Sequence, residues 1–128
     1  MGYIPFNSSV VQGDGGDPEE FVWEENGSPI DITTWVIYYT AKTSKDVTDA
    51  NASISYDSVN DPTIIVKSDS GSGTTDKFTI TLAATDTDDL TAGIYYQDIQ
   101  RIISSGDPWT LGMGKLTVEG DVTRRTTT

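Results

Sequence analysis

The chain contains neither cysteine nor histidine among its 128 residues. Their absence excludes disulfide bonds, thiolate nucleophiles, zinc sites built on these residues, and every catalytic pair in which histidine activates serine or cysteine. Most familiar hydrolase chemistry is therefore excluded. Two carboxylates facing each other across a cleft can hydrolyse glycosides without these residues, but nothing in the spacing of the carboxylates indicates such a cleft. We therefore expect no catalytic residues, no cofactor and no bound metal, and interpret the chain as a non-enzyme.

Basic residues are also scarce. Eight lysines and arginines stand against 20 acidic residues, which gives a formal net charge of −12. Such a balance repels nucleic acids and anionic membranes, so we expect neither as a partner. The acidic residues are mostly aspartates in turns. They indicate either ordinary solvation of a soluble particle, or calcium sites or adaptation to salt, and the sequence leaves these readings open.

Long apolar runs are missing as well. No stretch approaches the ~20 apolar residues of a membrane-spanning helix. Residues 1–6 lack the basic region and the apolar run of a secretory signal peptide. We therefore expect the protein to be made in a cytoplasm.

Alternation of apolar and polar residues is the main pattern that is present. Residues 19–24, 32–42, 78–82 and 95–99 alternate with a period of two, which is typical of half-buried strands. With no helix of consequence between them, they predict an all-β fold: a single antiparallel immunoglobulin-like β-sandwich of seven to nine strands. Its predicted core consists of Phe21, Trp23, Trp35, Ile37, Tyr39, Phe78, Ile80, Leu82, Tyr95, Ile99 and Leu116.

The most informative segment runs from Leu82 to Gln100. A strand end leads into an aspartate-rich corner, which Ala92-Gly93 closes before an aromatic strand opens with Tyr95. Immunoglobulin-like sandwiches cross between their sheets in this way, and a tyrosine hydroxyl anchors the crossing. We expect the Tyr95 hydroxyl to bond the backbone of residues 89–91, and the corner to hold one short helical turn.

Turn residues and composition predict where the strands turn and where the domain begins and ends. Asn26-Gly27 is the strongest short hairpin signal, while Gly112 and Gly114 inside the last strand indicate a bulge or a close backbone approach. The length fits one domain. We expect an extended N-terminal arm at 1–9, the sandwich at 10–120, and a polar C-terminal tail at 121–128.

The order of these pieces resembles a known family. Val10-Val11-Gln12-Gly13-Asp14 comes first, Gly27 to Trp35 and Ala84 to Gln100 follow, and Gly114 to Val118 and Asp121 to Arg125 close the pattern. The chain is similar to the immunoglobulin-like domain at the N-terminus of tailed-phage baseplate upper proteins, which also occurs as a stand-alone chain in tailed-virus genomes. The resemblance covers about residues 10–125. It implies a non-enzymatic virion protein that joins receptor-binding parts to the tail, and it carries no active-site residues.

Two groups of acidic residues are candidate cation sites. Asp86, Asp88 and Asp89 lie close together, and Asp14 and Asp17 form a second group. Hard cations such as calcium prefer carboxylate oxygens. Aspartates in turns also cap and bend the backbone, and the first group lacks the glycine and the glutamate of a calcium loop. We therefore favour capping at both places.

Protein–protein contact is the predicted function, in a tail or baseplate. The candidate contact residues are Ile4, Phe6, Tyr38, Tyr96, Arg124 and Arg125. The expected partners are other virion proteins or further copies of the chain, and the expected location is the virion. Alternatives are a capsid decoration protein and a carbohydrate-binding module, because aromatic rings on strands can form a flat sugar platform. The rings considered for that platform are Trp23, Tyr38, Tyr56, Tyr96 and Trp109.

Overall fold

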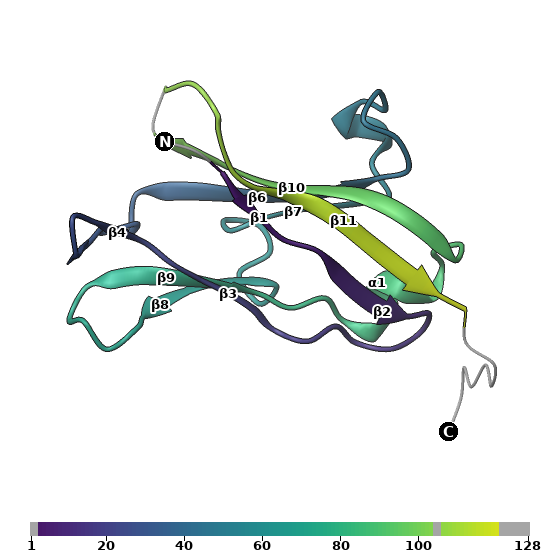
Figure 1. Cartoon of the computed structure of the whole chain (residues 1–128), viewed down its shortest axis with the longest axis horizontal. Coiled ribbons are helices and arrows are strands. Elements are labelled where there is room, and N and C mark those ends of the chain that lie inside the picture. The colour runs from purple at the N-terminus through teal and green to yellow at the C-terminus, as the bar shows by residue number, and fades with distance from the viewer. Residues whose placement is uncertain (1–2, 104–105, 121–128) are drawn as a thin grey trace.

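The computed structural model describes residues 3–103 and 106–120, which form two packed β-sheets (Figure 1). The larger sheet has the order β1-β11-β10-β6-β7, with β2 also paired to β11, and the smaller has the order β3-β9-β8. A two-stranded hairpin, β4-β5, projects from one end. No helix in the described ranges is long and apolar enough to cross a membrane. The elements are β1 (Ile4–Pro5), β2 (Ser8–Val11), β3 (Glu19–Val22), β4 (Glu24–Glu25), β5 (Ser28–Pro29), β6 (Trp35–Lys42), η1 (Asp49–Asn51), β7 (Ile54–Asp57), β8 (Ile65–Asp69), β9 (Thr75–Ile80), α1 (Ala84–Asp88), β10 (Gly93–Ile103) and β11 (Trp109–Glu119).

The strand order is that of an immunoglobulin variable-type sandwich. The strands β3, β9 and β8 correspond to strands B, E and D, and β11, β10, β6 and β7 correspond to G, F, C and C′. Eight of the strands in the described ranges have four residues or more. The predicted all-β sandwich of seven to nine strands is therefore confirmed. One detail differs from the prediction, because β1 and β2 run parallel to β11 rather than antiparallel.

The core lies between the two sheets, and all eleven residues predicted for it are buried. Alternation explains this success, since every second residue of β6 and β9 faces the opposite sheet. Phe78 is fully buried and stacks on Phe21, with ring centroids 5.0 Å apart, and on Trp23, at 6.2 Å. Further buried apolar residues are Val10, Ile32, Ala41, Ile54, Ile65, Leu111 and Val118.

A glutamine stands where antibody domains place a disulfide cysteine. That cysteine follows the corner tyrosine by two residues, and here the position is Gln97, which is 3% exposed. Tyr39 donates a hydrogen bond of 2.7 Å to the Gln97 side-chain oxygen. The Gln97 amide nitrogen in turn donates to Ser8 Oγ at 3.2 Å. Since burying an unpaired amide is costly, these bonds allow a polar side chain to occupy the interior.

The corner between β9 and β10 has the predicted anchor. The Tyr95 hydroxyl donates to the Thr91 carbonyl oxygen at 2.7 Å, within the predicted range of residues. The predicted helical turn is α1. Its buried Thr87 donates to the Asp14 carbonyl at 2.7 Å and accepts from the Gly13 amide at 3.1 Å. The corner is thus tied to the loop after β2.

The N-terminal segment belongs to the larger sheet. Ile4 lies opposite Gly112 in β11, and Ser8 lies opposite Leu116. The Phe6 ring packs edge-on against Phe21, with centroids 5.5 Å apart. The expected boundary at residue 10, between an arm and the sandwich, is therefore corrected: hydrogen bonds and an aromatic contact join residues 4–9 to the sandwich.

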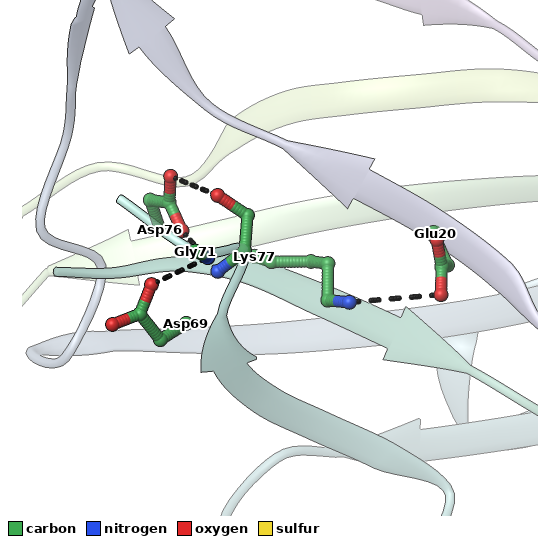
Figure 2. A network of polar contacts seen from close by, with 6 residues as sticks. Glu20, Asp69, Gly71, Asp76 and Lys77 are labelled. Atoms are coloured by element: carbon green, nitrogen blue, oxygen red, sulfur yellow. Dashed lines mark hydrogen bonds and ion pairs between the residues drawn. The ribbon is translucent and has the colours of Figure 1, made fainter. Parts of the chain in front are cut away.

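Two aspartates organise the tip of the β8-β9 hairpin (Figure 2). Asp69 accepts from the Gly71 and Gly73 amides at 2.7 and 3.1 Å. Asp76 accepts from the Ser70 amide and hydroxyl at 2.9 and 2.8 Å, and these bonds, the amide first, lower its pKa. Lys77 of the same strand pairs with Glu20 at 3.6 Å on the outer face of the smaller sheet.

Candidate partner-binding groove

A groove of about 380 Å³ crosses the outer face of the larger sheet. Its floor is a row of paired residues, in which Tyr96 of β10 lies opposite Lys42 of β6 on one side and Lys115 of β11 on the other. Residues paired across a sheet project from the same face, so these three side chains converge. The lining residues are Tyr3, Pro5, Asn7, Thr40, Lys42, Lys45, Tyr96, Gln97, Asp98, Met113, Gly114 and Lys115.

The N-terminal segment forms one wall of the groove. Asn7 Oδ1 accepts from the Lys115 amide at 2.9 Å, which fixes the chain beside β11. Gly114 permits this approach, because a Cβ built on it would lie 1.4 Å from the Phe6 carbonyl oxygen. A Cβ on Gly112 would lie 3.0 Å from the Phe6 ring. The close backbone approach predicted from these two glycines is confirmed, and β11 also shifts register between its pairings with Ile99 and Gln100.

Lysines give the groove its charge. Lys42, Lys45 and Lys115 are three of the five lysines in a chain of net charge −12. Lys42 Nζ pairs with Asp49 Oδ1 of η1 at 2.7 Å. Lys45 Nζ lies 5.4 Å from the centroid of the Tyr96 ring, a cation–π contact. Neither Lys45 nor Lys115 has an ion pair with any residue in the described ranges, and both are exposed.

Asp98 is the only carboxylate that lines the groove in the described part of the chain. Its side chain is partly buried, and burial raises the pKa of this carboxyl above its usual range, although the nearby Lys42 opposes the shift. Three lysines against one aspartate give the lining a formal charge of +2, which falls to +1 when the Asp49 carboxylate paired with Lys42 is counted. The groove is therefore a cationic surface on an acidic protein, suited to carboxylate groups.

The predicted contact residues do not form one surface in the structure. Tyr96 lies in the groove. Tyr38 lies on the same face but opposite Gln100, four residues along β10 from Tyr96, or roughly 13 Å at the usual rise of a strand. Ile4 is exposed. Phe6 is half-buried against the core, which leaves little of its ring for a partner. Arg124 and Arg125 lie outside the described residues.

The five aromatic rings considered as a sugar platform do not share a surface. Trp23 is buried, and Tyr56 packs against the core while its hydroxyl donates to Asp86. Trp109 lies against Arg101, whose guanidinium is 4.7 Å from its ring and 4.6 Å from the ring of Trp35. Because Arg101 lies opposite the buried Ile37, this stack is on the core side of the sheet rather than the groove side.

The acidic corner is used for capping, as the local pattern favours. One Asp86 oxygen accepts from the Ala83 amide at 2.6 Å, and the other accepts from Tyr56. Burial and this contact with Asp86 raise the pKa of Tyr56 to about 12. Within residues 3–103 and 106–120, no group of three or more acidic side chains is placed to hold a metal ion.

A second cavity of about 370 Å³ lies between the sheets beside β2 and β3. Four of its polar side chains form a hydrogen-bonded chain, in which Ser8 Oγ donates to Glu19 Oε1 at 3.0 Å and accepts from Gln97. Tyr39 completes the set, and burial raises its pKa. These bonds stabilise the interior and give the cavity a structural role.

Comparisons with known proteins give a distant likeness of shape. No family model matches the chain, and no curated protein sequence matches it significantly. One similar solved chain comes from work described as the structural basis of T cell specificity and activation by the bacterial superantigen toxic shock syndrome toxin-1, with 16% identity, a TM-score of 0.43, and coverage of 88% of this chain and 92% of that one. Another is the V domain of amphioxus IgVJ-C2, with 21% identity, a TM-score of 0.29, and coverage of 87% and 98%. Scores this low carry no functional argument, and the fold assignment rests on the strand order given above.

The sequence alone does not predict that the three lysines lie in one groove. Lys42 and Lys45 lie more than 50 residues from Tyr96, and each looks like an ordinary surface charge in isolation. The register of three strands brings them together with Lys115. The one signal in the sequence was the outward position of Tyr96 on its strand, and Tyr96 is among the residues that line the groove.

Proposed function

We propose that this chain is a non-enzymatic structural protein of a tailed-virus particle, working in the tail or baseplate as an adaptor or attachment module. Its location would be the virion, and its partners other virion proteins or further copies of the chain. The main support for a role in protein–protein contact is that three of the five lysines of this acidic protein line one groove. Complementary charge selects partners and orients them.

Two features support assembly over catalysis. The resemblance of residues 10–125 to a virion domain implies structural work. In the described ranges, Ser8, Glu19, Tyr39 and Gln97 of the inter-sheet cavity are joined by hydrogen bonds, and the groove offers lysines, amides and tyrosines with one partly buried carboxyl. This set is suited to binding an acidic surface.

A capsid decoration protein is a second candidate, because it would use the same kind of surface at another place in the particle. A carbohydrate-binding module is the third. The exposed Tyr3 and the Tyr96 ring both line the groove, which favours it. Against it, Lys45 lies over the Tyr96 ring, where a sugar would have to stack.

Mass spectrometry of purified particles tests the proposal. The particles come from cells that carry the gene, and the protein is sought in intact tailed particles and in separated tail and capsid fractions. Enrichment with tails supports the adaptor role, and enrichment with capsids supports decoration. Absence from particles, together with tight binding on an oligosaccharide array, would favour the carbohydrate-binding alternative.

A further inference from the structure

The β4-β5 hairpin is exposed and carries two acidic residues. Glu24 and Glu25 are both exposed, and neither forms an ion pair with another residue of the described ranges. The tip residues Asn26 and Gly27 have φ values of 52° and 80°, which suit the tight turn that Asn-Gly forms in hairpins. Two consecutive carboxylates thus lie just before a tight turn, and they project from the two faces of the hairpin because side chains alternate along a strand.

The hairpin and the groove belong to different parts of the sandwich. The hairpin follows β3 of the smaller sheet, whereas the groove lies on the outer face of the larger sheet, where it extends from the N-terminal segment to Lys42 at the end of β6. Figure 1 shows β4 at the left end of the long axis, while β6 runs from there toward the right. One copy can therefore present its hairpin without covering its own groove.

We propose that the groove receives the β4-β5 hairpin of a second copy of this chain, with the Glu24 and Glu25 carboxylates facing Lys45 and Lys115. The inference builds on the proposed structural role, because it names the partner of the groove. A contact between two different surfaces is heterologous. An open assembly has a free hairpin at one end and a free groove at the other, so copies add head to tail until a ring closes or a filament grows.

The charges allow this contact despite the net charge of −12. At physiological ionic strength, interactions between exposed charges fade beyond about 8 Å. Repulsion between the bulk of two copies is then largely screened, whereas carboxylates and ammonium groups in direct contact lie within that distance. Lys45 and Lys115 have no ion pair to break among the described residues, so contact with the hairpin costs no ion pair, and Lys45 gives up at most its cation–π contact with Tyr96.

Sedimentation of paired variants tests the contact. The first variant, Lys45→Gln with Lys115→Gln, keeps the hairpin and loses the groove charge. The second variant, Glu24→Gln with Glu25→Gln, keeps the groove and loses the hairpin charge. The control is Lys77→Gln, which removes a lysine that pairs with Glu20 on the other sheet. All the substituted side chains of the two test variants are exposed, and circular dichroism checks that each variant folds.

The expected results differ for each sample at about 0.15 M salt. The full chain and the control form assemblies that grow with protein concentration. Each test variant alone associates at least about tenfold more weakly, since it retains only one half of the charge pair. An equal mixture of the two test variants restores association but stops at dimers, because only one productive contact remains.

Three results would overturn the inference: a full chain that stays monomeric at every concentration, test variants that assemble as well as the control, or a mixture that contains monomers only. None of them would remove the proposed structural role, which is tested by presence in particles. A monomeric chain that is present in particles would mean that the groove binds a different virion protein.

Discussion

The Phe6 carbonyl oxygen lies 1.4 Å from the point where a Cβ on Gly114 would be. Two backbones therefore pass so closely that only glycine fits at residue 114. The contact holds the N-terminal segment against β11, where that segment forms a wall of the groove. A backbone relationship that stabilises the fold thus also shapes the candidate site.

The first prediction concerns this contact. Gly114→Ala should lower the free energy of unfolding by at least about 2 kcal/mol, because backbone atoms must move to admit a methyl group. The matched control is Gly120→Ala, where the nearest atoms would lie 3.9 Å away and the expected change is within about 0.5 kcal/mol. Urea unfolding measures both values. Equal stability of the two variants would contradict the close approach.

The N-terminal segment gives the second prediction. Phe6→Ala should cost about 1–3 kcal/mol, because a half-buried ring loses its edge contact with Phe21. Ile4→Ala is the comparison, and it should cost less, because Ile4 is exposed. Thermal unfolding followed by circular dichroism ranks the two. If removing Phe6 cost nothing, residues 4–9 would be an arm that the sandwich does not need.

The third prediction concerns the corner. Tyr95→Phe keeps the buried ring but removes the hydroxyl that donates to the Thr91 carbonyl. The variant should be less stable by about 1–2 kcal/mol, because the carbonyl loses its partner. Denaturant unfolding measures the change, and Tyr3→Phe, on an exposed residue, is the control. A Tyr95→Phe variant as stable as its control would remove the anchoring role.

Asp98 gives a prediction that depends on pH. Burial raises the folded-state pKa of this carboxyl, so its ionisation costs stability as the pH rises through the raised value. Asp98→Asn should therefore be more stable than the natural chain at pH 7, and the difference should shrink below the usual pKa range of aspartate. Urea unfolding at pH 7 and pH 3 tests this, with the exposed Asp46→Asn as control. A difference that grows on acidification would contradict the assignment.

Much of the fold could be predicted because its signals are local. Alternation in sequence places Trp35, Ile37 and Tyr39 on one face of a strand, whatever the rest of the chain does. The spacing between the aspartate-rich turn and Tyr95 identified the corner and its hydrogen bond. Asn26-Gly27 fixed a hairpin by backbone preference alone.

The remaining features depend on contacts between distant segments. Alternation places Gln97 on the same face as Tyr95 and Ile99, but no local pattern indicates that Tyr39 and Ser8 satisfy its amide inside the core. Phe6 looks like part of a loose arm, and only its approach to Gly114 reveals its place. The groove needs the register of β6, β10 and β11, which no local pattern specifies.

The most direct test of the central claim compares particle incorporation of two variants. Cells carrying the gene produce particles with the natural chain, with Lys45→Gln and Lys115→Gln together, or with the Lys77→Gln control, and quantitative mass spectrometry measures each chain per purified particle. We expect the control to be incorporated like the natural chain and the groove variant to be strongly depleted. Equal incorporation of all three would contradict a structural role that acts through the groove.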